Sequence, residues 1–328
     1  MKRTTKVLAL FFVMLFAMEM LAFVAAAEEV SLDEAEEIIL NNADSNGKLL
    51  GERTGELKEE EKYDLYKINI KESGALSIKL KSDFKIYLSL SPIFYEIFDE
   101  EGNQLNGSEW LTHSGAHQIE YNYDCLAGIY YIKLDQGWWM NEGKYTFTIA
   151  FEPCKESFSE SLLQSFNSRD TAPEIIIGGN YDGQIAVNDT IDLYCLQLYK
   201  QQAFNIGDFD RDSNNKYSIF NYANEEVWSM AGNENTSCSL DSGVYYLEVT
   251  KQYNQTGNYS FMLFTRGDLD NDGSISSADA RTTLRMSVGL ENVKQNSAAF
   301  AAADFNNNGL IQPDDARSIL RVSVGLEP

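Results

Sequence analysis

Apolar and polar residues alternate in five short segments in the first half of this 328-residue chain. The segments are rich in Tyr, Ile, Phe and Leu, and Gly, Asn and Asp separate them. They are YDLYKINI (63–70), ALSIKLK (75–81), YEIFDEEG (95–102), GIYYIKL (128–134) and KYTFTIAF (144–151). A period of two residues predicts β-strands, and frequent turn residues between short strands favour an antiparallel β-sandwich.

The same pattern recurs further along the chain, which indicates an internal duplication. Gly55 stands nine residues before the triplet Asp64-Leu65-Tyr66, and Gly183 stands nine residues before Asp192-Leu193-Tyr194. Three later pairs of segments also match: 96–105 with 218–227, 126–134 with 241–249, and 142–147 with 256–261. The chain is therefore expected to contain two tandem sandwiches of one fold.

These repeated motifs resemble the bacterial pre-peptidase C-terminal (PPC) domain. Its pattern runs from an Asp-x-Tyr strand through an apolar strand ending at Asp-x-x-Gly to a Gly-x-Tyr-Tyr strand and a final Gly-x-Tyr-x-Phe strand. Residues 28–154 follow this pattern well, whereas residues 155–264 have Asn221 and Asn224 in place of the Asp and Gly of the middle turn. The resemblance implies two jelly-roll-like sandwiches of the kind appended to secreted hydrolases and peptidases, some of which bind calcium or polymers.

A polar segment precedes each predicted sandwich. SLDEAEEIILNN (31–42) and ESFSESLLQSFNSRDTAPEI (156–175) are each expected to form a lead-in with a helical turn. The second segment is rich in Ser and Glu, so it also serves as a linker between the two sandwiches.

The pattern changes after residue 264, where two acidic loops each precede a stretch with helical periodicity. GDLDNDGSISSADARTTLRMSVGLE (267–291) returns in closely related form as ADFNNNGLIQPDDARSILRVSVGLE (303–327). Carboxylates at alternate positions followed by glycine are typical of calcium loops. The predicted ligands at loop positions 1, 3, 5, 7, 9 and 12 are Asp268, Asp270, Asp272, Ser274 (by its carbonyl), Ser276 and Asp279, and then Asp304, Asn306, Asn308, Leu310 (by its carbonyl), Gln312 and Asp315.

Two such loop-helix (F-hand) motifs in tandem resemble a type I dockerin over residues 265–328. The resemblance implies a small all-α domain that holds two Ca²⁺ ions, which supply much of its folding free energy. Its two halves are expected to close each other's apolar face. The stripes Ala280, Leu284 and Val288, and Ala316, Leu320 and Val324, are expected to form this core.

A dockerin implies a protein partner, the cohesin module of a scaffoldin in a polysaccharide-degrading complex such as a cellulosome. In the resembled family the contact residues lie at loop positions 10 and 11 and on the following helix, here Ser277, Ala278, Pro313 and Asp314. Arg281, Arg285, Arg317 and Arg321 are further candidates, because Arg forks suit interfacial carboxylates. Since the two loop pairs differ, the two halves are not expected to be interchangeable.

The N-terminus indicates export. Lys2, Arg3 and Lys6 precede an apolar run that ends at Ala25-Ala26-Ala27, which predicts a signal peptide over residues 1–27; a membrane anchor is the alternative. Removing those residues leaves 23 basic and 49 acidic residues, and 23 − 49 gives a net charge of −26. So negative a surface disfavours nucleic acid and anionic membranes as partners.

The four cysteines are widely spaced. Cys125, Cys154, Cys195 and Cys238 could form disulfides or remain buried thiols.

No common catalytic motif is present, and two sandwiches already occupy residues 28–264. His113 and His117 are the only histidines and lie in strand-and-turn sequence. Trp138 and Trp139 stand between two predicted strands and are the candidate ligand site, because exposed aromatic rings can stack on sugars. Packing in the core is the alternative for at least one of them.

The sequence therefore predicts a secreted, noncatalytic accessory subunit. Its dockerin docks the chain on a scaffoldin, and its two sandwiches act as binding or spacer modules. Two alternatives stay open at this point: a glycoside hydrolase of the same kind of complex, and a peptidase-associated protein. No residue is assigned a catalytic role.

Overall fold

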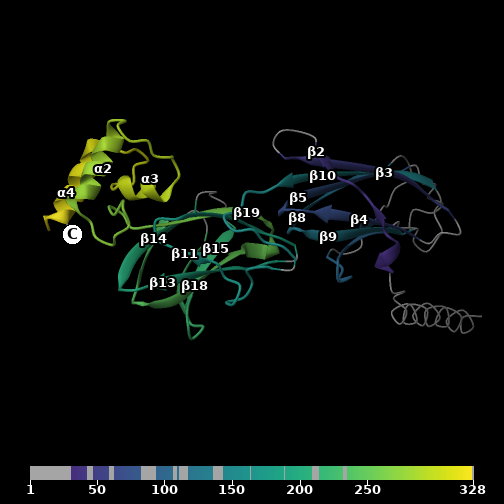
Figure 1. Cartoon of the computed structure of the whole chain (residues 1–328), viewed down its shortest axis with the longest axis horizontal. Coiled ribbons are helices and arrows are strands. Elements are labelled where there is room, and N and C mark those ends of the chain that lie inside the picture. The colour runs from purple at the N-terminus through teal and green to yellow at the C-terminus, as the bar shows by residue number, and fades with distance from the viewer. Residues whose placement is uncertain are drawn as a thin grey trace, which may run out of the picture.

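The structure is a computed structural model, and it describes residues 31–42, 47–58, 63–82, 94–105, 109–110, 117–135, 143–162, 164–187, 189–208, 214–231 and 235–326. Figure 1 shows two strand-rich units side by side and a small helical unit beyond the second. Most of the described secondary structure is β, as the alternating segments predict. No helix in these residues is long and apolar enough to cross a membrane.

The first strand-rich unit is a pair of sheets, called here the first sandwich. One sheet has the order β1-β4-β9-β6-β7, made of Glu36–Glu37, Tyr63–Ile70, Gly128–Asp135, Phe94–Asp99 and Glu109–Trp110. The other has the order β2-β3-β10-β5-β8, made of Asn41–Asn42, Leu49–Leu57, Gly143–Pro153, Gly74–Ser82 and His117–Cys125. All five predicted strands are confirmed, as β4, β5, β6, β9 and β10.

The period of two residues places alternate side chains between the two sheets. In β10 the buried residues are Tyr145, Phe147, Ile149 and Phe151, and the residues between them are less buried. Side chains of β4 and β9, such as Ile68 and Ile132, belong to the same cluster from the opposite sheet. This shared apolar core holds the first sandwich together.

The second sandwich repeats this arrangement strand for strand. Its sheets have the orders β11-β13-β18-β15-β16 and β12-β19-β14-β17. The first comprises Glu174–Ile175, Asp192–Leu198, Gly243–Lys251, Asn215–Asn221 and Glu226–Ala231, and the second comprises Asn180–Ile185, Gly257–Phe264, Gln202–Asp208 and Asn235–Leu240. The orders coincide with those of the first sandwich, except that β2 has no counterpart among the described residues. The duplication read from the sequence is therefore present in the strand pairing.

Two expectations about the sandwiches need correction. The sheets are not antiparallel throughout, because β1 pairs with β4 and β11 pairs with β13 in parallel. Between the two parallel strands the chain passes through the opposite sheet, as β2 and β3 in the first sandwich and as β12 in the second, so it returns to the first sheet in the same direction. A short 3₁₀ helix, Leu32–Glu34, forms in the first lead-in, but the described part of 156–175 contains bridges and turns in place of a helix.

The C-terminal part, residues 265–326, is called here the helical module. It contains α2 (Ser277–Ser287), α3 (Ala298–Ala303) and α4 (Pro313–Ser323), and a 3₁₀ turn, Gln252–Asn254, lies earlier between β18 and β19. The helices α2 and α4 pack against each other. Figure 1 shows α3 on the side that faces the second sandwich.

The predicted apolar stripes of α2 and α4 are confirmed at Ala280 and Ala316, which are buried, and are wrong at the four larger residues. Leu284 and Val288 are exposed by 45% and 58%, and Leu320 and Val324 are similarly exposed. Besides these two alanines, the buried residues are Asp279 and Thr283 in α2 and Asp315 and Ile319 in α4. The cause is that each Asp near the helix start turns toward its loop, which brings the residue one turn later to the inside.

Candidate metal centres

The first acidic loop follows β19 almost directly and has the backbone shape of a tight turn. Asn271 and Gly273 have φ values of 58° and 81°, the left-handed region that Asn and Gly tolerate best. In the second loop, Asn307 and Gly309 occupy the matching positions with φ values of 59° and 83°. The two loops therefore have the same local fold as well as related sequences.

Carboxylates gather inside the first loop. One oxygen from each of Asp268, Asp270 and Asp279 lies within 4.8 Å of the others. Asp268 is fully buried, and its Oδ1 has no hydrogen-bond partner among the described residues. Burial raises the pKa of Asp268, and the neighbouring carboxylates of Asp279, Asp272 and Asp270 raise that pKa further. An unpartnered buried carboxylate oxygen is costly without a cation beside it.

The remaining predicted ligands of the first loop lie around this cluster. The carboxylate of Asp279 accepts hydrogen bonds from the backbone N–H of Leu269 at 2.8 Å and of Ser276 at 2.8 Å, which ties the start of α2 to the loop. Ser276 caps α2. Asp272 is exposed and accepts from the backbone N–H of Ser274 at 2.8 Å.

The second loop repeats these contacts with fewer charges. Asp304 accepts from the backbone N–H of Gly309 at 2.7 Å, as Asp268 accepts from Gly273 at 2.9 Å. Asp315 accepts from the N–H groups of Asn306 and Gln312, and it is fully buried. Asn308 accepts from the N–H of Leu310 at 2.9 Å, and Asn306, Asn308 and Leu310 are exposed.

The donor set of both loops suits a hard divalent cation. Carboxylate, amide and carbonyl oxygens are the ligands that Ca²⁺ takes in flexible loops, and a glycine at the sixth position allows the sharp turn of such a loop. The first loop offers four carboxylates and the second offers two, Asp304 and Asp315. The residues present therefore fit calcium in both loops, with the stronger negative charge in the first.

The candidate partner residues lie on the outside of the helical module. Ser277, Ala278 and Pro313 are exposed and Asp314 is half-buried. The four arginines Arg281, Arg285, Arg317 and Arg321 are exposed as well. Arg285 is engaged within the module, because its guanidinium pairs with Glu291. The exposed apolar residues Leu284, Val288, Leu320 and Val324 lie on the same two helices, and sequence reasoning had assigned them to the core.

A second acidic cluster lies in the second sandwich, and the sequence analysis missed it. Oxygens of Glu160, Asp189 and Asp192 lie within 4.8 Å of one another, and all three residues are buried. Oδ2 of Asp189 and Oδ1 of Asp192 have no hydrogen-bond partner among the described residues. Burial raises the pKa of all three carboxyls, and Asp192 raises that of Glu160 further while Asp189 raises that of Asp192.

A chain of hydroxyl groups connects this cluster to the core of the second sandwich. Tyr259 donates to Asp192, and the hydroxyls of Tyr194 and Tyr259 lie 2.5 Å apart. The first sandwich has the same chain, in which Tyr145 donates to Asp64 and its hydroxyl lies 2.5 Å from that of Tyr66. The repeated Asp-x-Tyr motif is thus a repeated hydrogen-bonded unit.

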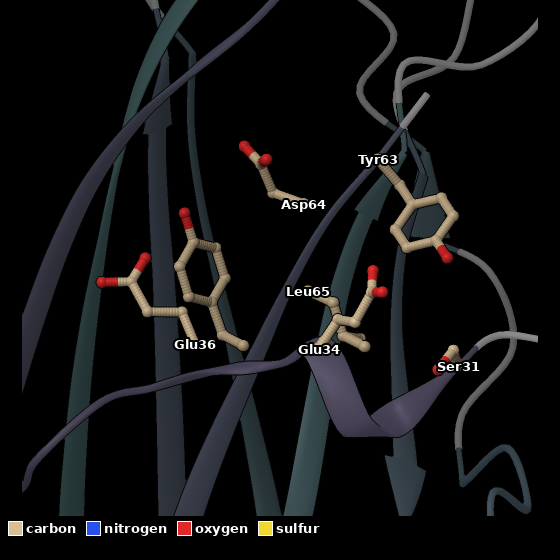
Figure 2. A pocket seen from close by; sticks show the side chains of 7 residues that line it. Ser31, Glu34, Glu36, Tyr63, Asp64 and Leu65 are labelled. Atoms are coloured by element: carbon tan, nitrogen blue, oxygen red, sulfur yellow. The ribbon is translucent and has the colours of Figure 1, made fainter. Parts of the chain in front are cut away.

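Beside Asp64 the first sandwich is open. A pocket of about 250 Å³ is lined by Ser31, Glu34, Glu36, Tyr63, Asp64, Leu65 and Tyr66. Figure 2 shows these side chains, which come from the first lead-in and from β4. Arg53 pairs with Glu36 at 2.8 Å, so part of the negative charge in this pocket is compensated.

Among the described residues, the other sequence candidates are not part of these centres. Trp138, Trp139 and His113 lie outside the described residues, and His117 is placed only by its backbone in β8. Cys125, Cys154, Cys195 and Cys238 are all free thiols, and Cys125 and Cys238 are buried.

No protein-family model and no curated protein matches the chain. Among solved structures, it is similar to the pre-peptidase C-terminal domain of collagenase from Bacillus anthracis, with 17% identity and a TM-score of 0.26 over 28% of this chain and 93% of that one. It is also similar to the CBM22-1–CBM22-2 tandem domain of Xyn10C from Paenibacillus barcinonensis, with 9% identity and a TM-score of 0.24 over 70% and 90%. Tripeptidyl peptidase 2 gives 9% identity and a TM-score of 0.28 over 70% and 24%.

All three TM-scores lie below 0.5, so these likenesses say nothing about what this chain binds. The sandwich architecture follows from the chain's own strand pairing and its two apolar cores.

Proposed function

We propose that this chain is a secreted, noncatalytic subunit that docks on a cohesin module of a scaffoldin through its helical module, which calcium organises. The supporting observation is the pair of matched loops, each with a buried first aspartate and a buried twelfth aspartate at the start of a helix. Two sites of this kind on one small module suit a domain whose fold depends on bound cations.

The outer face of α2 and α4 suits a protein partner. Leu284, Val288, Leu320 and Val324 are large apolar residues that remain exposed on two neighbouring helices. Arginines at 281, 285, 317 and 321 are exposed on the same two helices, and apolar anchors with Arg forks are the usual composition of an interface centre. The two sandwiches act as binding or spacer modules on the other side of the chain.

The test is binding of the mature chain, residues 28–328, to a panel of purified cohesins by calorimetry. We expect at least one cohesin to bind in calcium and to lose its affinity when a chelator removes the ion. Binding that is equally strong in the chelator contradicts the role of calcium, and no binding to any cohesin in calcium contradicts the proposed partner.

We propose a further cation site at Glu160, Asp189 and Asp192. Three buried carboxylates with two unpartnered oxygens cannot all be ionised without a compensating charge. A calcium ion there would join Glu160, which lies in the linker, to Asp192 at the start of β13. It would therefore fix the linker against the second sandwich.

A further inference from the structure

The last strand of the second sandwich is buried on both of its faces. Tyr259, Phe261 and Leu263 of β19 belong to the core of the sandwich. Met262 and Phe264 point the other way and belong to a separate apolar cluster with Ala298 and Ala302 of α3. A strand at a solvent-facing surface needs apolar residues on one face only, so the second face of β19 is built to be covered.

The first sandwich provides an internal comparison for these two positions. Aligning Gly143-Lys144-Tyr145 with Gly257-Asn258-Tyr259 places Thr148 opposite Met262 and Ala150 opposite Phe264. Thr148 and Ala150 are half-buried and belong to no described apolar cluster. The fold itself thus accepts Thr and Ala at these positions, and the larger apolar pair is found where α3 lies.

Polar contacts fix the same junction. The side-chain oxygen of Asn180, in β12, accepts from the N–H of Ala298 at 2.7 Å and so caps the first turn of α3. Lys200 donates from its Nζ to the carbonyl of Gly273 in the first acidic loop at 3.2 Å. Asn271 of the same loop packs on Gly178, where an added Cβ would lie 2.2 Å from its Nδ2.

The connection between β19 and the first acidic loop is very short. β19 ends at Phe264, and Asp268, the first ligand position of the loop, follows after three residues. Gly267 donates from its N–H to the carbonyl of Ala302 at 2.9 Å, which holds this short connection against α3. The acidic loop therefore cannot rearrange without moving residues that β19 and α3 share.

We propose that the outer face of β19, formed by Met262 and Phe264, is the docking surface of the helical module, so that cation binding in the first loop stabilises the second sandwich. This inference rests on the proposed calcium binding. Coupling of this kind is reciprocal, so the intact sandwich also strengthens cation binding in the loop. A partner bound to α2 and α4 would then hold the second sandwich in one fixed orientation.

The test is a double-mutant cycle read by hydrogen exchange on residues 28–328 in calcium. One change is Asp268→Ala, which removes the first ligand of the loop. The other is the pair Met262→Thr and Phe264→Ala, which installs the residues that the first sandwich carries. The amides of β19 and of α2 are followed in all four proteins, and the second-sandwich carboxylates are left unchanged throughout.

In the otherwise unchanged chain, we expect Asp268→Ala to lower the protection of both α2 and β19. At free calcium about 100 times the Kd of the loop, the loss is about 100-fold for amides that exchange through unfolding. In the Met262→Thr, Phe264→Ala background, Asp268→Ala should still lower the protection of α2 but should leave β19 unchanged.

Two results overturn the proposal in different ways. If Asp268→Ala lowers the protection of α2 and leaves β19 unchanged in the chain with Met262 and Phe264, the two units are not coupled, although calcium binding stands. If Asp268→Ala changes neither segment, calcium binding in the loop fails together with the coupling. Loss of the native circular dichroism spectrum in the Thr and Ala background would also count against the proposal, because it would make these residues part of the sandwich's own stability.

Discussion

At the scale of single residues, the most informative groups are carboxylate oxygens that are buried without a partner. Among the described residues, Asp268 Oδ1, Asp189 Oδ2 and Asp192 Oδ1 are in this position. A buried polar atom without a hydrogen bond costs about 1–3 kcal/mol, and a charged one costs more. A bound cation would remove this cost, so we expect both acidic clusters to be more stable with an ion than without one.

The buried cluster predicts an unusual pH dependence in a chelator. Burial raises the pKa of Glu160 to about 9 and that of Asp192 to about 8, so the folded chain holds protons that the unfolded chain has released. Stability from this source is fully present below pH 4, near the unfolded pKa values, and is lost as the pH rises through the folded values. We expect the urea midpoint of the second sandwich to fall between pH 6 and pH 9.

The measurement is urea unfolding in a chelator across that range, with Asp192→Asn as the comparison. The substitution leaves one fewer carboxylate to ionise and so should flatten the pH dependence. A midpoint that rises steadily from pH 6 to pH 9 in the unchanged chain would contradict the assignment of these pKa shifts.

The difference in charge between the two loops predicts their order of filling. The first loop has four carboxylates and the second has two, and more ligand charge favours tighter calcium binding. We expect Asp268→Ala to remove the tighter calorimetric step and Asp304→Ala to remove the weaker one. The opposite assignment would show that ligand charge does not decide the order.

At the scale of elements, the sequence predicted the strands well and the helix faces less well. Alternation identified β4, β5, β6, β9 and β10, because a strand has only two faces and one of them must be apolar. In α2 the buried residues Asp279 and Thr283 are polar, so hydropathy favours the largely exposed line 280-284-288. In α4 the buried Ile319 stands next to the exposed Leu320, and periodicity does not distinguish the two. The contact of Asp279 with its loop determines which side of α2 is buried, and a hydropathy pattern does not show that contact.

The exposed lines on α2 and α4 predict where a partner binds. We expect Leu284→Asp together with Leu320→Asp to weaken cohesin binding by more than about 30-fold, because a charge at an interface centre costs about 2 kcal/mol or more. The single variants show which helix carries the contact. The fold should survive, since both side chains are about half exposed.

Ile176→Asp is the matched control, because Ile176 is 71% exposed on the second sandwich. It changes the charge of the chain by the same amount per substitution and should leave cohesin affinity unchanged. Equal affinity of the Leu284→Asp, Leu320→Asp variant and the unchanged chain would exclude this face as the binding surface.

At the scale of the whole molecule, the units are joined by specific contacts. Asp124 of β8 accepts from Gln184 at 3.2 Å and from Thr256 at 2.6 Å, both in the second sandwich. Its carbonyl accepts from the N–H of Val187 at 3.0 Å. The sequence predicted the order of the units but not these junctions, because Asp124 and Met262 have no motif that distinguishes them from surface residues.

The contact between the second sandwich and the helical module could have been predicted by aligning the two copies of the sandwich. Comparing the copies position by position shows Met262 and Phe264 where the first copy has Thr148 and Ala150. The acidic cluster was harder to find, since Glu160 lies in the linker, about 30 residues from Asp189 and Asp192, and acidic residues are common throughout the chain.

The junction between the sandwiches predicts the effect of Asp124→Ala. Hydrogen bonds to a charged group contribute about 1.5–3 kcal/mol, so their loss should loosen the sandwiches relative to each other. We expect faster proteolysis within residues 155–165, by about tenfold or more, with each sandwich still folded. Asn122→Ala, on the exposed part of the same strand, is the control and should be cleaved at the original rate.

The central claim is that the two acidic loops are calcium sites, and counting bound ions tests it most directly. The measurement is equilibrium dialysis of residues 28–328 at saturating calcium, beside a variant that carries Asp268→Ala and Asp304→Ala. We predict that the variant binds two ions fewer than the unchanged chain. An identical number of bound ions in the two proteins would contradict the claim.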